Sequence, residues 1–101
     1  MQIIKLTPEE NTLNGKINNT DDFVVVLCDA ANGSFSINLP DEGTAWRVYV
    51  IKKTDSSSNV ITIRSKNNTK IDGEFTVSLS SQYDTVSVVS DKSEYFKLWS
   101  I

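Results

Sequence analysis

The chain has 101 residues, 39% of them hydrophobic, and a net charge of -3 from 10 basic and 13 acidic side chains. This length is typical of one domain, and the acidic excess argues against a nucleic-acid surface, which needs clustered positive charge. No apolar run approaches the roughly 20 residues that cross a bilayer, so we expect no membrane insertion.

Residues 1–22 are expected to be an attachment segment outside the main domain. Ile3, Ile4 and Leu6 predict a short strand that Pro8 ends. The residues that follow are polar, rich in Asn and interrupted by Gly15. Such a composition is poorly suited to a core of its own. We therefore expect the segment to dock on a neighbouring subunit or a larger assembly, and its deletion to leave a folded protein.

Residues 23–101 are expected to form the β-domain. Phe23–Cys28 is apolar at every position, which predicts a strand buried on both faces. Cys28 has no cysteine partner and is interpreted as a small buried hydrophobe. Ser34–Leu39 alternates apolar and polar residues, as a strand with one face in a core does.

The segment Trp46–Lys53 predicts the bulkiest strand, with apolar side chains on both faces. The closing segment Tyr95–Trp99 has the same property. One sheet layer covers only one of these faces, so the other is expected to meet a second copy of the chain. The residues that we expect at this interface are Trp46, Tyr49, Ile51, Tyr95, Trp99 and Ile101. A sugar-binding platform is the alternative for the aromatic residues Trp46, Tyr49, Tyr95, Phe96 and Trp99.

Three more strands are expected between these segments. Val60–Arg64 predicts one of them, and Asp72-Gly73 predicts a tight turn before the next. Phe75, Val77 and Leu79 are expected to face the core from that strand, and Val86 and Val88 from the strand after it. About eight strands and no helical window favour an all-β fold, an antiparallel sandwich or prism-like domain. Assembly as a trimer is expected to hide the second apolar faces of the two bulky strands.

The corner Gln82-Tyr83-Asp84 permits two interpretations. In the structural one, the Tyr83 ring covers the sheet edge while its hydroxyl and the Asp84 carboxylate satisfy corner amides. In the functional one, Tyr83 and Asp84 contact a glycan.

The remaining polar residues predict no catalysis, no metal and no cofactor. The chain has no histidine and a single cysteine, which removes the commonest general base and the ligands of zinc and iron–sulfur sites. Carboxylates occur as adjacent pairs such as Glu9-Glu10, and adjacent residues of an extended chain point to opposite faces. We therefore expect no hydrolytic activity.

From Gly33 to Trp99, about two-thirds of its length, the chain resembles a β-module found in bacteriophage structural proteins, especially tail-fibre and head-fibre chains. That module has an "xLP" turn, then "GRVYxIKK", "VTI", "TIDG" and "LxxQYDSVxLVSDG", with an aromatic pair near the end. The matching residues are Leu39-Pro40, Arg47-Val48-Tyr49-Val50-Ile51-Lys52-Lys53, Val60 to Ile63, Ile71-Asp72-Gly73, Gln82-Tyr83-Asp84 and Val88 to Asp91. Lys92 stands where the module often has Gly, which indicates a different turn.

The resemblance implies a virion structural protein, made in the host cytoplasm, that forms homotrimers and contacts capsid or fibre-base proteins. Only about thirty residues precede the match, without heptads or shaft repeats, which favours a capsid decoration or capping protein over a long fibre. Two alternatives stay open. One is a module at a fibre tip that binds a host surface glycan, and the other is a small carbohydrate-binding domain from outside phages.

Overall fold

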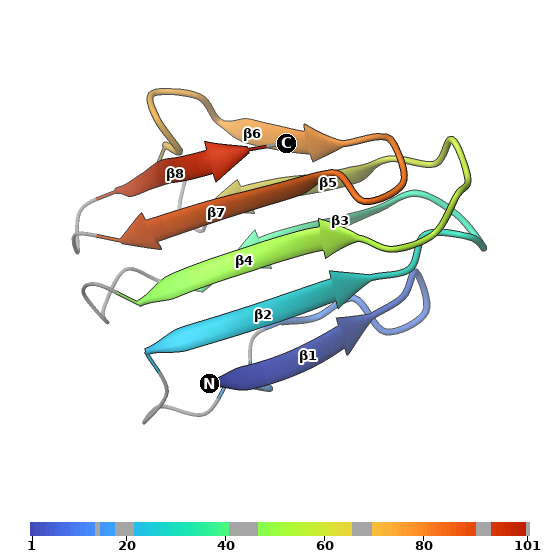
Figure 1. Ribbon diagram of the computed structural model, residues 1–101, viewed down its shortest axis with the longest axis horizontal. Coiled ribbons are helices and arrows are strands. Elements are labelled where there is room, and N and C mark those ends of the chain that lie inside the picture. Colours follow the sequence, from blue (N-terminus) through green and yellow to red (C-terminus); the bar gives the residue numbers. More distant parts are fainter. Residues whose placement is uncertain (14, 18–21, 41–46, 66–69, 91–93, 101) are drawn as a thin grey trace.

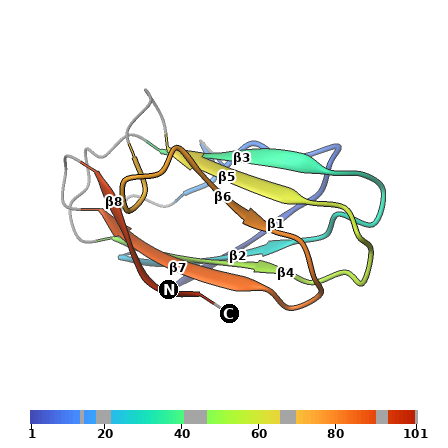
Figure 2. The ribbon, with the colours of Figure 1, turned by 90° about the horizontal axis from the view of Figure 1, so that it is seen from above.

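The protein is all-β and consists of two sheets stacked as layers (Figure 2). The computed structural model describes residues 1–13, 15–17, 22–40, 47–65, 70–90 and 94–100, the side chains of Trp99 and Ser100 excepted. These residues form eight strands and no helix. The molecule measures 34 × 27 × 22 Å along its principal axes. The predicted all-β class is confirmed.

The larger sheet has five strands and lies in front in Figure 1. Its strands, in spatial order, are β1 (Gln2–Leu6), β2 (Phe23–Cys28), β4 (Val48–Lys53), β7 (Thr85–Ser90) and β8 (Tyr95–Ser100). The smaller sheet consists of β3 (Phe35–Leu39), β5 (Ile61–Ser65) and β6 (Thr76–Leu79). Each strand lies within two residues of a segment in which the sequence predicts one.

Both sheets are mixed, so the expectation of an antiparallel fold is wrong. β1, β2 and β4 run parallel to one another, as do β3 and β5, and the remaining pairs are antiparallel. The reason is that β2, β3, β4 and β5 alternate between the two layers. A chain that crosses to the other layer and returns enters the first sheet in its original direction, so β4 lies parallel to β2.

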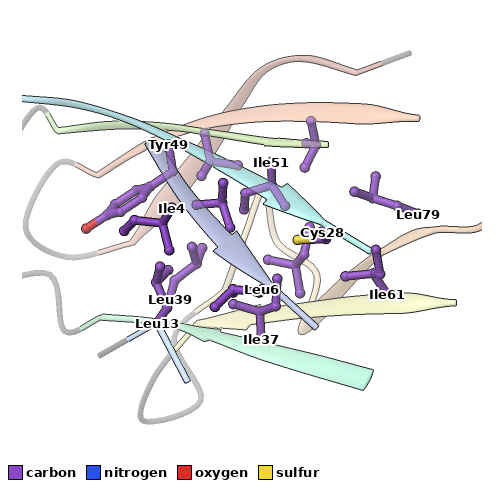
Figure 3. Close-up of a cluster of buried hydrophobic side chains, with 14 of the residues drawn as sticks. Ile4, Leu6, Leu13, Cys28, Ile37, Leu39, Tyr49, Ile51, Ile61 and Leu79 are labelled. Carbon is purple, nitrogen blue, oxygen red and sulfur yellow. The ribbon is translucent and has the colours of Figure 1, made fainter. Parts of the chain in front are cut away.

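The core lies between the two layers and draws on all eight strands (Figure 3). The strands alternate, so that every second side chain points inward. The buried apolar residues are Ile4, Leu6, Leu13, Val24, Val26, Cys28, Ala30, Phe35, Ile37, Leu39, Tyr49, Ile51, Ile61, Ile63, Ile71, Leu79, Val86, Val88 and Tyr95.

The N-terminal segment shares this core. β1 is an edge strand of the larger sheet, paired in parallel with β2, and it buries Ile4 and Leu6. Leu13 is also buried, and the Gln2 side-chain amide donates to the carbonyl of Lys16 at 2.5 Å. The structure therefore places residues that we expected in a separate attachment segment inside the same two layers as residues 23–100.

Two further details differ from the sequence-based expectations. β2 is buried on one face only, with Phe23 43% exposed on the other. Phe75 precedes β6 and is exposed instead of facing the core, with the Lys70 ammonium 5.2 Å from its ring centroid. The turn at Asp72-Gly73 is confirmed: both residues have positive φ, 51° and 80°, as in a type I′ turn.

Candidate assembly surface

The outer face of the five-stranded sheet carries apolar side chains from every strand, although Thr85 and Ser87 of β7 also lie on this side and are buried. Because inward and outward side chains alternate, the buried Ile4, Val24 and Ile51 imply that their neighbours point away from the core. The strand registers then place these outward residues side by side. One row is Ile3, Val25, Val50 and the buried Ser87, and the other is Phe23, Val48, Val89 and Phe96.

We call this set the apolar face, defined by Ile3, Phe23, Val25, Leu27, Val48, Val50, Val89 and Phe96. Ile3 is 56% exposed and Phe96 37% exposed, while the central valines are half-buried by their neighbours. Leu98, at a bulge between β7 and β8, adds a further exposed apolar side chain at the β8 edge. A continuous apolar patch over five strands is typical of an interface, since soluble monomers rarely expose more than a few hundred Å² of such surface.

Charged residues lie at the two ends of the apolar face. Lys5 and Lys52 flank Leu27 in register at the end where β1, β2 and β4 finish. The Lys52 ammonium is 5.3 Å from the centroid of the Tyr83 ring, which continues the surface beyond the sheet. Asp22, exposed, lies at the opposite end, where its carbonyl accepts a hydrogen bond from the Val48 amide.

Three of the residues expected at an interface between copies lie in the core instead. Tyr49, Ile51 and Tyr95 are each at most 2% exposed. The rings of Tyr49 and Tyr95 meet edge-to-face, with centroids 6.2 Å apart. The Tyr95 hydroxyl donates to the Pro40 carbonyl at 2.7 Å. These side chains are therefore covered by their own chain.

The remaining three expected interface residues cannot be placed in the same way. Trp46 and Ile101 lie outside the described residues, and the side chain of Trp99 does as well. The backbone of Trp99, on β8, pairs with Ser87 of β7. Trp99 therefore belongs to the same sheet as the apolar face.

The alternation predicted for β4 is correct, but the choice of the outward face is not. Val48 and Val50 point outward, and the larger Tyr49 and Ile51 fill the space between the sheets. Arg47 is buried beside them and donates from Nη1 to the Tyr49 hydroxyl at 3.4 Å. Burial raises the pKa of Tyr49, although the Arg47 guanidinium partly offsets this. Tyr49 therefore stays protonated in the core.

The corner at Tyr83 and Asp84 combines a capped turn with an exposed aromatic ring. The Asp84 carboxylate accepts hydrogen bonds from the amides of Ser80 and Ser81, at 3.1 and 2.9 Å, in agreement with the structural interpretation of this residue. Tyr83 has a φ of 70°, unusual for a residue with a side chain, and is 59% exposed. The corner thus holds the Tyr83 ring out from the surface, beside Lys52.

A buried ion pair, which the sequence analysis did not identify, closes one end of the two layers. The Lys53 side chain is fully buried, and its ammonium lies 2.8 Å from the Asp55 carboxylate and 2.9 Å from the Ser57 carbonyl. Asp55 also accepts hydrogen bonds from the Ser57 hydroxyl and, at 2.7 Å, from the Ala30 amide. This network joins the β2–β3 and β4–β5 connections. The signal in the sequence is alternation, because Lys53 follows Tyr49 and Ile51 on the inward face.

The electrostatics of this network favour structure over reactivity. Burial by itself would raise the pKa of Asp55, but hydrogen bonds from Lys53, Ser57 and backbone amides hold it well below its usual range. Burial, with a smaller contribution from the Asp55 carboxylate, raises the pKa of the nearby Cys28 thiol to about 12. Cys28 is therefore a thiol packed in the core, as expected from the sequence.

Among the described residues, no group of three or more His, Cys, Asp or Glu side chains is arranged to hold a metal ion. Within the same part of the chain, no helix has the length and hydrophobicity that crossing a membrane requires. Comparison of the chain with protein-family models, curated proteins and solved structures found no match.

Proposed function

We propose that this protein is a phage virion structural protein, a capsid decoration or a component of a head or tail fibre, that acts by trimeric assembly and by attachment to the virion. The observation that carries the assembly is the apolar face, which spans all five strands of one sheet. The virion role rests on the resemblance of residues 33–99 to the phage β-module. The protein acts on no substrate and needs no cofactor.

Burial of the apolar face between copies supplies the driving force. Covering one large apolar side chain stabilises an assembly by roughly 1.5–3 kcal/mol. In the single chain, more than a third of the surface stays exposed at each of Ile3, Phe23 and Phe96. Contact with a neighbouring copy would remove this apolar surface from water. Three such interfaces together would contribute free energy comparable to the stability of a small domain.

The experiment is light scattering or native mass spectrometry on the wild type and on a matched pair of variants. Val50→Lys places a charge in the middle of the apolar face, and Thr62→Lys places the same charge on the outward side of the three-stranded sheet. We expect three chains per particle for the wild type and for Thr62→Lys. For Val50→Lys we expect folded monomers and a self-association constant at least about 100-fold weaker, since an unpaired charge in an apolar interface costs several kcal/mol. A wild type that remains monomeric at high concentration would contradict assembly.

The virion role has its own test, mass spectrometry of purified particles with a count of copies per particle. Hundreds of copies indicate capsid decoration, a handful indicate a tail or fibre, and absence from particles contradicts the proposal.

A second candidate function is binding of a host surface glycan, which the exposed ring of Tyr83 favours. Aromatic rings stack on sugars, and the neighbouring Lys52 ammonium and Gln82 amide supply donors. In a glycan-array experiment, binding that is lost in Tyr83→Ala but kept in Phe75→Ala supports this function, because Phe75 is an equally exposed aromatic away from the corner.

A further inference from the structure

The two edges of the five-stranded sheet differ in how their main-chain groups are paired. β1 forms one edge and β8 forms the other (Figure 1). An edge strand has N–H and C=O groups that no strand of its own sheet satisfies, so each edge is either covered by its own chain or open to another one. The pairing along the two edges therefore indicates where a further strand can add.

The edge at β1 is open. The Asp29 amide, just after β2, donates to the Leu6 carbonyl at 3.0 Å, so the main chain of Leu6 faces β2. In a parallel pair, the main-chain groups of successive residues point to opposite sides, so Ile4 also faces β2 while Ile3 and Lys5 face away from it. Among the described residues, none forms a hydrogen bond with the main chain of Ile3 or Lys5. Both residues thus offer an N–H and a C=O group to a strand from outside.

The edge at β8 is covered over its first half by another part of the same chain. The Tyr95 amide donates to the Lys70 carbonyl at 3.1 Å, and the Asp72 amide donates to the Tyr95 carbonyl at 3.0 Å. The Asp72 carboxylate then accepts a hydrogen bond from the Lys97 amide at 3.2 Å. Residues 98–100, the end of β8, lie beyond these contacts.

The end of β8 is also bent. Lys97 pairs with Val88 and Trp99 pairs with Ser87, so Leu98 is an extra residue in a bulge. Bulges bend a strand and increase its twist. Figure 2 shows β8 ending on the outer side of the larger sheet, which is the side of the apolar face. This bend directs the strand toward a neighbour whose sheet meets this one at an angle, with the two apolar faces turned toward each other.

The strand registers place the end of β8 and the open part of β1 at the same level along the sheet. One row of paired residues crosses the five strands through Ile3, Val25, Val50, Ser87 and Trp99. β1 and β8 also run in the same direction, because β8 is antiparallel to β7 and β7 is antiparallel to β4. A rotation about an axis along the strands keeps both level and direction. It therefore brings the end of β8 of one copy beside Ile3 of the next.

We infer that, in the assembly, the end of β8 of one copy pairs in parallel with the open edge of β1 of the next copy. The inference rests on the proposed function, since it specifies how the assembling copies join. A contact between two different edges closes into a ring when the rotation between copies fits. Pairing of β1 with β1 would join two copies and stop there. Pairing of β1 with an edge of the smaller sheet would extend a polar outward side and leave the apolar face in water.

Three sheets joined in this way would enclose their apolar faces. Five strands about 4.8 Å apart, with one further spacing to the next copy, make each side roughly 24 Å wide, and the middle of each side then lies roughly 7 Å from the axis. Packed sheets are about 10 Å apart, so side chains extend about 5 Å from each sheet. The apolar side chains of the three copies would therefore gather around the axis, with the smaller sheets outside in water.

Disulfide cross-linking between the two edges tests the contact. The double variant Ile3→Cys with Leu98→Cys places one thiol on each edge. Within one copy these strands lie four spacings apart, about 19 Å, whereas a disulfide needs Cα atoms about 4.4–6.8 Å apart. Any disulfide between the two positions therefore joins two copies. Lys5→Cys with Leu98→Cys is a second probe, two residues further along the same side of β1.

The control for chance collisions is Thr62→Cys with Leu98→Cys, whose first thiol lies on the outward side of the smaller sheet. Cys28 is buried in all these variants, and circular dichroism verifies that each is folded. The variants are oxidised at concentrations at which the wild type associates, and the products are separated under denaturing, non-reducing conditions. We expect the Ile3 pair to give at least about five times more covalent three-chain product than the control, because only adjacent edges bring the thiols within reach.

The outcomes separate this inference from the proposed function. Three-chain particles in which neither probe pair exceeds the control would overturn the edge pairing and leave the trimer intact. A covalent two-chain product from Ile3→Cys alone would place β1 against β1, which also overturns the contact with β8. A wild type that stays monomeric would overturn both proposals.

Discussion

The two sheets of this protein have similar inner faces and opposite outer faces. The smaller sheet presents Ser36, Asn38, Thr62, Arg64, Thr76 and Ser78 on its outward side, a wholly polar set. The larger sheet presents the apolar face. Since both sheets bury their inner side chains against each other, the difference does not arise from folding of the single chain. It is the arrangement that the proposed assembly requires, with a polar sheet in contact with water and an apolar sheet covered by another copy.

The Lys53–Asp55 ion pair is the contact whose loss should destabilise the two-sheet fold most. We expect Asp55→Asn to lower the free energy of unfolding by about 3 kcal/mol, because it leaves the fully buried Lys53 ammonium without its counter-ion. Chemical denaturation near neutral pH measures the effect. Glu74→Gln, at an exposed carboxylate, is the control and should change stability by less than about 0.5 kcal/mol.

The same pair has a defined pH dependence. The pKa of Asp55 is lower in the folded than in the unfolded protein, so its contribution is complete above the unfolded value of about 3.9 and is lost as the pH falls toward the folded value. The stability difference between wild type and Asp55→Asn should therefore shrink below about pH 4. A difference that persists unchanged in acid would show that packing and not charge is responsible.

Two substitutions on β1 test the inner and the outer face of the larger sheet separately. Leu6→Ala should lower the free energy of unfolding by about 3 kcal/mol, because Leu6 is 1% exposed and its removal leaves a cavity. Ile3→Ala on the outward face should cost the single chain no more than about 0.5 kcal/mol but weaken self-association. Thermal and chemical unfolding at concentrations below association measure the first effect, and light scattering measures the second.

The β1 result also decides the role of the N-terminal segment. Because Ile4, Leu6 and Leu13 belong to the core, deletion of residues 1–22 should unfold the protein instead of leaving a folded one that fails to attach. A stable truncated protein would show that the larger sheet does not need β1.

The smallest expected effect is at Tyr83, which lies beside Lys52 beyond the end of the apolar face. Tyr83→Asn should raise the stability of the single chain by about 0.5 kcal/mol. Relief of the strained φ, worth roughly 1–2 kcal/mol, outweighs the lost contact with Lys52, roughly 0.5–1 kcal/mol. Under the second proposed function, the same variant should also reduce binding of a glycan that stacks on the ring. A loss of stability above about 1 kcal/mol would instead make Tyr83 a structural corner residue.

Much of the secondary structure could be predicted because its signals are local. The alternation in β3 and the Asp72-Gly73 turn depend on residues adjacent in the chain, and both agree with the structure. Phe75 could not be placed in this way. Its spacing from Val77 and Leu79 predicts burial, but β6 begins after it at Thr76 and it projects outside the core.

The sequence predicts that an apolar surface is available for assembly, but it does not identify the residues that form this surface. Phe23–Cys28 is apolar on both faces, which indicates that a second surface is to be covered, and the structure places the outward half of that strand in the apolar face. The expected interface residues Tyr49 and Ile51 were chosen by size, and size instead suits them to the space between the layers. Alternation separates the two faces of a strand without saying which one points inward.

The sequence by itself determined the all-β class, the positions of the strands and the alternation along them, because steric preference and side-chain periodicity act between near neighbours. Only the tertiary structure decided the mixed direction of the sheets, the inclusion of β1 and Leu13 in the core, and the outward side of β4. These depend on which strands cross between layers and which side chains fill the gap between them, and both are set by contacts between residues far apart in the chain.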